Sequence, residues 1–199
     1  MAFAIVLASK SAIRADLLRS AGLAPEIRPA DIDERGLESA WAAATLSPAA
    51  VARLLAEEKA KAVSRLVPDA LVIGADQTMA LGQERFTKAA DLAAAREKLM
   101  RLRARTHELH SGYALARGGK VLSAGVASAS LTMRDFDEAF LDRYLARAGA
   151  AILASVGCYQ LEHLGVTLFE RIEGDYFTIL GLPLLPLLAD LRRAGVEGL

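Results

Sequence analysis

The stretch Val72-Ile73-Gly74-Ala75-Asp76-Gln77-Thr78, or VIGADQT, decides how the rest of this chain is interpreted. Its apolar half, together with the preceding Leu71, is typical of a buried β-strand. An aspartate and an amide follow at once. Asp76 is either a turn residue or helix cap, or a carboxylate at the carboxyl end of a central strand, where an open α/β sheet places its ligand-binding groups.

Strand and helix patterns alternate on both sides of this stretch, which predicts a mixed α/β chain. Besides the VIGAD run, the expected strands are Phe3–Leu7, Leu109–Ala116, Val121–Met133, Val166–Ile172 and Tyr176–Leu180, the last two paired around Glu173-Gly174-Asp175. The expected helices are Ser11–Ala21, a long one that Ser47 and Pro48 open and that runs to about Leu66, Ala89–Arg103, Phe136–Ala148, and a last one that Pro183 opens. Gly118-Gly119 predicts a hairpin turn.

The composition is that of a globular protein. The 199 residues are 53% hydrophobic, enough for one compact domain or two small lobes that share a core, and we expect a single domain over residues 1–199. The apolar runs are too short, or too broken by Gly and Pro, to cross a bilayer, and no secretory signal pattern opens the sequence. A cytoplasmic location without membrane contact is therefore expected.

The charge balance argues against a large polyanionic partner. The sequence holds 24 Lys and Arg residues against 24 Asp and Glu residues, so it lacks the net positive field that nonspecific nucleic-acid binding requires. Nucleic acid is not an expected partner. A small, highly charged ligand is still compatible with local clusters of Lys and Arg.

The cysteine and the histidines predict no metal centre of their own. Cys158 is the only cysteine, which excludes an internal disulfide and a thiolate cage and favours a small buried apolar residue. His107 and His110 are three residues apart in a strand pattern, which places them on opposite faces. His163 has no neighbour at metal-ligand spacing and is expected in an exposed loop.

The junction between the first strand and the first helix, LASKSAIR, has the features of an anion site. Ser9 and Ser11 add hydroxyl donors to the free N–H groups and the positive dipole end of a helix start. Arg14, on the first turn, has the reach to face an anion held there. Taken alone, the simpler interpretation is that Ser11 caps the helix and Arg14 is a solvated surface residue.

Four further charged residues have both a functional and an ordinary interpretation. Asp33 and Glu34 lie in an irregular stretch, where adjacent acids are usually solvated. Lys59 shares a helix face with apolar residues, where lysines more often extend their ammonium to the surface than bind ligands. Lys88 precedes a helix and has the ordinary interpretation of a boundary charge.

The order of several stretches is more specific than any one of them. The chain contains, in sequence, LASKSAIRADLL, DIDE, EEKAKAV, VIGADQT, a lysine about a dozen residues later, RTHELHSGYAL and LFERIEGDYFTILGLPL. This order resembles that of the Maf family of nucleoside triphosphate pyrophosphatases over nearly the whole chain. The resemblance implies an α/β fold of the Maf and inosine-triphosphatase type, with helices flanking a mixed sheet and the active site in a cleft. It also implies a divalent metal ion, a homodimer, and house-cleaning hydrolysis of a nucleotide to its monophosphate and pyrophosphate.

The resemblance assigns five residues to the triphosphate. Ser9, Ser11 and Arg14 match the family's phosphate-binding start. Lys59 matches its helix lysine, and Lys88 matches the lysine of its Gly-Lys-Pro motif. Fixed cations suit such a site because the α-phosphorus is surrounded by negative oxygens.

The sequence departs from the family at two of these places. Ala12 stands where the family has a proline, which loosens the turn before the first helix. Lys88 is flanked by Thr87 and Ala89 instead of glycine and proline, which leaves the placement of this lysine open.

By the same resemblance, Asp76 is the catalytic aspartate. It is expected to act as the general base for the nucleophilic water and to contact the metal. Asp33 and Glu34 match the family's acidic loop and are its expected partners at the metal. Mg²⁺ is the expected ion, with Mn²⁺ as the alternative, because the sequence offers only hard oxygen ligands.

Three residues bear on the nucleotide base. Gln77 and Glu162 match the family branch that acts on 7-methyl-GTP, whereas the branch acting on dTTP and UTP has threonine and glutamine there. A glutamate accepts from both N1–H and the 2-amino group of guanine, while thymine and uracil offer one donor between two carbonyls. Ile13 stands where the 7-methyl-GTP branch has a tryptophan suited to stacking on a cationic base, so the match favours guanine more than its methyl group.

Two alternatives stay open from the sequence. The first is a dTTP and UTP pyrophosphatase with the same chemistry. The second is a binding regulator without catalysis, since the family takes its name from an association with septum formation in cell division.

Overall fold

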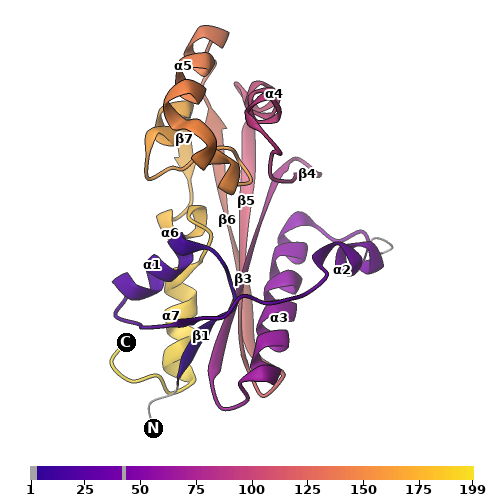
Figure 1. Cartoon of the computed structure of the whole chain (residues 1–199), viewed down its shortest axis with the longest axis vertical. Coiled ribbons are helices and arrows are strands. Elements are labelled where there is room, and N and C mark those ends of the chain that lie inside the picture. Colours follow the sequence, from indigo (N-terminus) through magenta and orange to yellow (C-terminus); the bar gives the residue numbers. More distant parts are fainter. Residues whose placement is uncertain (1–3, 42–43) are drawn as a thin grey trace. The chain divides into compact units, whose positions relative to one another are not determined.

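The α/β class is confirmed by the structure, a computed structural model that describes residues 4–41 and 44–199 (Figure 1). The strands are β1 (Ile5–Leu7), β2 (Glu26–Ile27), β3 (Leu71–Leu81), β4 (Glu84–Phe86), β5 (Thr106–Arg117), β6 (Lys120–Met133) and β7 (Phe169–Glu173). The helices are α1 (Ala12–Ser20), α2 (Glu34–Trp41), α3 (Pro48–Leu66), α4 (Leu92–Leu102), α5 (Glu138–Ala148), α6 (Tyr176–Ile179) and α7 (Leu184–Arg193), with the 3-10 turns η2 (Gly149–Ala154) and η3 (Leu164–Leu168). Phe3, the expected start of the first strand, lies outside the described residues.

The strands form one mixed sheet within the described part of the chain. Its order is β2-β1-β3-β5-β6-β7, and β4 pairs with β3. β1 is parallel to β2 and β3, whereas β4 runs antiparallel to β3 and β7 antiparallel to β6. Gly118 and Gly119, at φ 55° and 79°, form the predicted two-residue turn between β5 and β6, where both positions require positive φ.

The chain divides into two compact units. The first comprises Met1–Gln77, His110–Ser128 and Asp175–Leu199, and the second comprises Thr78–Leu109 and Ala129–Gly174. β3, β5 and β6 therefore contribute residues to both units.

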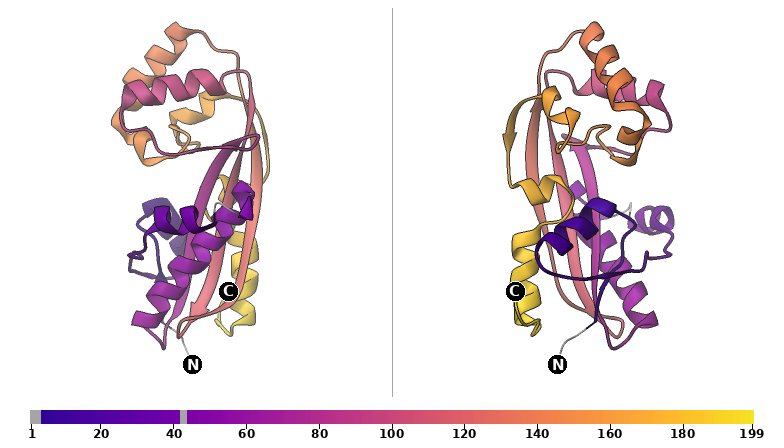
Figure 2. Two further views of the ribbon diagram at one scale, coloured as in Figure 1. Left: turned by 90° about the vertical axis from the view of Figure 1, so that its right-hand side faces the viewer. Right: turned by 60° about the vertical axis from the view of Figure 1, so that its left-hand side comes forward.

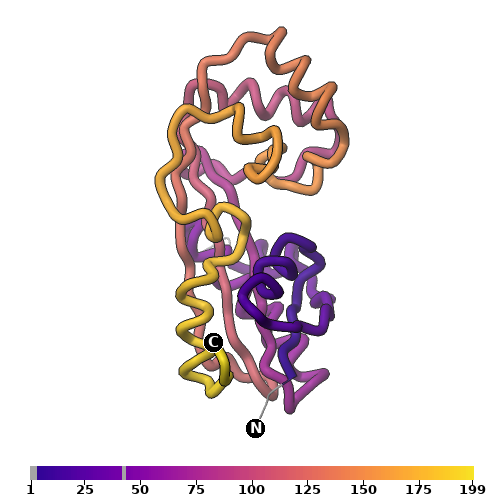
Figure 3. Tube along the Cα trace, turned by 90° about the vertical axis from the view of Figure 1, so that its left-hand side faces the viewer, coloured from indigo at the N-terminus to yellow at the C-terminus, as the bar shows by residue number. Residues whose placement is uncertain are grey.

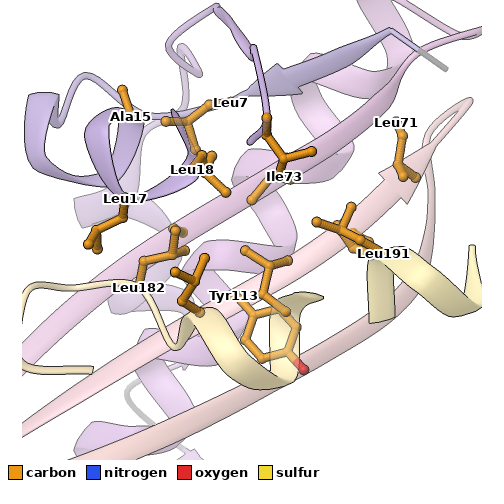
Figure 4. Close-up of a cluster of buried hydrophobic side chains, with 14 residues drawn as sticks. Leu7, Ala15, Leu17, Leu18, Leu71, Ile73, Tyr113, Leu182 and Leu191 are labelled. Carbon is orange, nitrogen blue, oxygen red and sulfur yellow. The ribbon is translucent and has the colours of Figure 1, made fainter. Parts of the chain in front are cut away.

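In the first unit, helices cover both faces of the strands. Ile73 packs with Leu18 of α1 and Leu191 of α7 (Figure 4). The neighbouring Val72 points to the other face, as strand alternation requires, and packs with Val63 of α3. α1 and α7, near the two ends of the chain, thus share one core layer, and their traces lie side by side (Figure 3).

Two glycines let α3 lie very close to the sheet. A Cβ on Gly74 of β3 would lie 2.1 Å from the carbonyl oxygen of Ala56, and a Cβ on Gly112 of β5 would lie 2.3 Å from that of Ala52. Both distances are far inside van der Waals contact, so a side chain at either position would push α3 away. The helix is held at this spacing by direct contact of its backbone with the sheet.

In the second unit, α4 and α5 pack together (Figure 2). Arg96 of α4 joins the two helices, because its guanidinium binds Glu138 at 2.7 Å and Asp142 at 2.9 Å. α4 begins later than the sequence suggested. Asp91 accepts a hydrogen bond from the amide of Ala94 and fixes the start of the helix at the next residue.

The predicted strand Tyr176–Leu180 is wrong, because these residues form α6 and a turn. Its β-branched and aromatic residues resemble a strand, but the carboxylate of Asp175 accepts from the amide of Thr178 at 3.0 Å and caps a helical turn. The preceding expected strand is shorter than predicted, since η3 occupies its first residues, and it pairs with β6 instead.

Candidate active site

Asp76 lies inside a strand, not at its carboxyl end as the sequence suggested. β1 pairs with β3 only as far as Leu7 and Ile73, whereas β3 continues to Leu81 with β4 as an antiparallel partner. The strand that ends near Asp76 is therefore β1. Asp76 lies where β3 has lost its parallel neighbour, which is the sheet position that suits a ligand-binding group.

The carboxylate of Asp76 pairs with Lys59 of α3. Nζ of Lys59 is 2.5 Å from Oδ1 of Asp76 and 2.9 Å from Oε1 of Glu34. The Lys59 and Asp76 side chains are 12% and 13% exposed, so this lysine does not simply extend its ammonium into water. The structure thus brings together three residues that lie far apart in the sequence.

Burial shapes the acidity of this group. It raises the pKa of Asp76, while the positive charges of Lys59 and Arg14 act in the opposite direction. Glu34 adds a smaller upward contribution to the same pKa. A buried carboxylate with a raised pKa beside two cations is a common property of catalytic carboxyl groups.

Arg14 of α1 is also part of this group, and it is not a solvated surface residue. Its Nε donates to the carbonyl of Gly181 at 2.8 Å, and its Nη1 donates to the carbonyl of Ala75 at 2.9 Å and to Oγ of Ser9 at 3.0 Å. Burial lowers the pKa of Arg14, and the nearby Asp76 raises it.

Ser11 has the capping role that the simpler interpretation gave it. Its Oγ accepts from the amide of Arg14 at the start of α1, and its own amide donates to Oγ of Ser9 at 3.3 Å. Both serines therefore support the first turn of α1 and the guanidinium of Arg14. Their assignment to a triphosphate stays a prediction.

Gln77 uses its amide nitrogen within the protein. Nε2 donates to Oγ of Ser111 at 3.0 Å and to the carbonyls of Thr178 and Ile179 at 3.2 and 3.0 Å. These contacts fasten α6 to the strands β3 and β5. The predicted role of Gln77 in reading the base is thus compatible with an indirect action, through the position of α6.

The acidic loop is partly helical, in contrast to the irregular stretch expected. α2 begins at Glu34, and Oδ1 of Asp33 accepts the amide of Gly36 at 3.0 Å in the manner of a helix cap. Glu34 reaches Lys59, whereas Asp33 lines a cavity of about 390 Å³ on the outer side of α3, whose other lining residues are Ile32, Gly36, Leu37, Glu58, Ala62 and Arg65.

The three remaining candidates are described by the unit to which each belongs. Ile13 is half-buried on α1 in the first unit. Lys88 and Glu162 belong to the second unit, where Lys88 is exposed between β4 and α4 and Glu162 is half-buried before η3.

His163 and Cys158 have the exposure that the sequence predicted. His107 and His110 are both in β5. Nε2 of His107 forms a hydrogen bond with the hydroxyl of Tyr159 at 2.7 Å, and Nδ1 of His110 forms one with Oγ of Ser128 at 2.7 Å. His163 is exposed, and Cys158 is buried. Across residues 4–41 and 44–199, no set of three or more His, Cys, Asp or Glu side chains is arranged to hold a metal ion.

Sequence reasoning missed the backbone part of the site. The carbonyls of Ala75, Thr178, Ile179 and Gly181 accept from Arg14 or Gln77. A carbonyl carries no side-chain signal. The one available signal is Gly181, whose φ of 97° favours glycine.

Comparison with known proteins decides the family. The profile described as "Maf-like protein" matches residues 4–194. The chain belongs to the Maf family. A Maf relative from Mesorhizobium japonicum, named 7-methyl-GTP pyrophosphatase, is 54% identical over 96% of both chains. One of the same name from Brucella abortus is 51% identical over 97% of both chains.

A third Maf relative has a broader name. The protein from Bradyrhizobium diazoefficiens is named nucleoside triphosphate pyrophosphatase and is 54% identical over 94% of this chain and 92% of its own. Among the described residues of this Maf protein, no helix has the length and apolar character to span a membrane.

Proposed function

We propose that this Maf protein is a house-cleaning enzyme that hydrolyses a nucleoside triphosphate to its monophosphate and pyrophosphate, with 7-methyl-GTP as the preferred substrate. The group of Asp76, Lys59 and Glu34, with Arg14 close enough to act on the pKa of Asp76, is the observation that carries the proposal. The names of the relatives support both the reaction and the substrate.

Asp76 is the general base of the proposed reaction. Attack at the α-phosphorus requires a water that is oriented and deprotonated as it approaches. Burial raises the pKa of Asp76, which makes its carboxylate a stronger base than that of an exposed aspartate, while Lys59 and Arg14 favour its ionised form. The carboxylate accepts the proton of the water, and pyrophosphate leaves.

Cations of the chain offset the charge of the triphosphate. Within the described residues, the hydrogen bonds of the Arg14 guanidinium involve Nε and Nη1, which leaves Nη2 for a phosphate oxygen. Lys59 offers its third donor in the same way, because an ammonium has three and two of them are directed at carboxylates. Ser9, Ser11 and Lys88 complete the proposed phosphate contacts.

The donor set also fits a divalent ion, Mg²⁺ first and Mn²⁺ as the alternative. Mg²⁺ binds through one or two carboxylates together with substrate phosphates and keeps several waters, and Asp76 and Glu34, which share the ammonium of Lys59, are the two carboxylates proposed to hold it. Asp33 fits less well, because its carboxylate caps α2. When bound, the ion supplies positive charge to the phosphate oxygens and lowers the pKa of a coordinated water.

Glu162 is proposed to read guanine through its two adjacent donors, and Gln77 to act on the base pocket through α6. The test is pyrophosphate release by the purified protein from 7-methyl-GTP, GTP, dTTP and UTP, with Mg²⁺ and with a chelator. We expect 7-methyl-GTP to be cleaved best and the chelator to stop turnover. A preference for dTTP or UTP of about tenfold or more would instead support the alternative substrate class.

The proposed enzyme is a cytoplasmic homodimer, and of these two properties the family resemblance implies the dimer. Sedimentation equilibrium tests the assembly directly, and a monomer at micromolar concentration would contradict it. The regulator alternative gains support only if no nucleotide yields pyrophosphate while the protein binds a cell-division protein.

A further inference from the structure

The segment that carries Lys88 is held on both sides of that residue. Lys88 itself is exposed, but the carbonyl of Thr87 before it accepts a hydrogen bond from Nζ of Lys98. The backbone amide of Ala89 after it donates to the thiol of Cys158. The two peptide groups on either side of the Lys88 Cα therefore both have a fixed partner.

Lys98 is a buried lysine on a helix. It lies on the charged helix α4, yet it is only 9% exposed. Its ammonium also donates to the carbonyl of Val156 at 3.0 Å and interacts with Cys158, so three acceptors surround three donors. Burial lowers the pKa of Lys98, and a buried ammonium is retained only where such partners replace water.

The position of Cys158 is also fixed by its surroundings. It is fully buried, and its φ of 57° is a backbone conformation that residues other than glycine seldom adopt. Strained positions of this kind persist only where the surrounding structure fixes them. Here the surroundings include Lys98 and the amide of Ala89.

We propose that Lys98, assisted by Cys158, is a positioning residue that fixes the backbone on both sides of Lys88 and so presents its ammonium to the triphosphate. The inference rests on the proposed function, because it takes Lys88 as a phosphate ligand. Thr87 and Ala89 do not restrict this backbone by themselves as glycine and proline would. Lys98 and Cys158, which lie outside the segment, restrict its backbone instead.

Lys98→Met tests the proposal, because methionine keeps the length of the buried chain and removes its donors. The dissociation constant of a non-hydrolysable triphosphate analogue should rise about tenfold or more, as expected when a charge-assisted contact is lost. Binding of the monophosphate product should change little. Arg96→Met is the matched control, since it removes a charge from the same helix without a contact to the Lys88 segment.

A double variant separates positioning from general damage. In the Lys88→Ala background, Lys98→Met should cause no further loss of triphosphate binding, because the group that it positions is already absent. An equal loss with and without Lys88 would overturn the proposal. So would a folded Lys98→Met protein that binds the triphosphate like the parent.

Amide exchange gives a readout that does not depend on activity, and Cys158 gives a second variant in case Lys98→Met does not fold. The amide of Ala89 should exchange faster in Cys158→Ala than in Cys158→Ser, which keeps an acceptor. Unchanged exchange in Cys158→Ala would contradict the assigned contact. A parent that releases no pyrophosphate from any nucleotide defeats the proposed function, whereas an active, Lys88-dependent parent that is indifferent to Lys98→Met defeats this inference alone.

Discussion

The guanidinium of Arg14 donates a hydrogen bond to the carbonyl of Ala75. This carbonyl lies two residues past the point where β3 loses its parallel neighbour. Ile73 is the last residue of β3 that pairs with β1, and its carbonyl accepts from the amide of Ala8 at 2.8 Å. Carbonyls two residues apart point to the same side of a strand, so Nη1 of Arg14, at 2.9 Å from Ala75, continues the ladder with a side chain. Arg14 therefore has a structural role in addition to its proposed phosphate contact.

Arg14→Met should destabilise the protein as well as weaken triphosphate binding. It removes charge-assisted hydrogen bonds to two carbonyls and one hydroxyl, each worth about 1.5–3 kcal/mol. Methionine also removes the cost of burying the guanidinium, so we expect a net fall in the free energy of unfolding of about 2–4 kcal/mol in urea titrations. Arg19→Met is the control on the same helix. Its exposed pair with Asp16 should contribute less than about 1 kcal/mol. Equal losses for both variants would refute the ladder role.

Asp76→Asn should lower kcat by roughly a hundredfold to ten-thousandfold, the usual range for the loss of a general base. The fold should survive, since the amide keeps the size of the carboxylate. Turnover with saturating metal and the thermal midpoint are measured together. Parental turnover would remove Asp76 from the mechanism, and a collapsed midpoint would make it a structural residue.

Lys59→Met should shift the pH profile of kcat/KM. Lys59 lowers the pKa of Asp76, so its removal raises that pKa and moves the acidic limb of the profile to higher pH. The base must be ionised, and activity is therefore lost on the acidic side of this limb. A limb that stays in place while kcat/KM falls would limit Lys59 to phosphate binding.

Glu162→Gln should change the choice of base. Activity on 7-methyl-GTP and GTP should fall, while activity on UTP and dTTP is spared or rises, because the nitrogen of an amide donates and only its oxygen accepts, whereas both oxygens of a carboxylate accept. Side-by-side rates on the four nucleotides measure the effect. A uniform change in all four rates would show that Glu162 does not read the base.

His107 should make the protein less stable in acid. Burial lowers the pKa of His107 from 6.5 to about 4, so the folded state resists protonation while the unfolded state takes up a proton below pH 6.5. The contribution is complete above pH 6.5 and falls by about 3 kcal/mol as the pH drops to about 4. Unfolding free energies of the parent and His107→Gln across this range give the difference. Parallel pH curves for the two proteins would contradict the assignment.

Local signals predicted some elements to the residue and misdirected others. Ser47 and Pro48 mark the start of α3 because a cap and a first-turn proline act within a few residues. Tyr176–Leu180 has strand-like side chains, but Asp175 determines a helical turn there. Here a single cap outweighed intrinsic preference.

The site, too, was only partly predictable from the sequence. Asp76 and Lys59 both lie in stretches that match the family. The resemblance therefore assigned both to one site, and the structure shows them in contact. The burial of Lys98 has no signal in its own stretch, because its partners Thr87 and Val156 lie outside α4, 11 and 58 residues away in the sequence. Contacts of this kind become visible only when the chain is folded.

The two glycines against which α3 packs fix the position of this helix on the sheet. Gly74 and Gly112 leave no room for even a methyl group, and Lys59 follows Ala56 by about one helical turn. The spacing between the Lys59 ammonium and the Asp76 carboxylate therefore depends on the contact between the backbones of α3 and β3. Repacking of side chains has little influence on it. Under the proposed function, substrate preference can change through residues such as Glu162 while Lys59 and Asp76 stay paired, so a scaffold of this kind can accept new bases with the same chemistry.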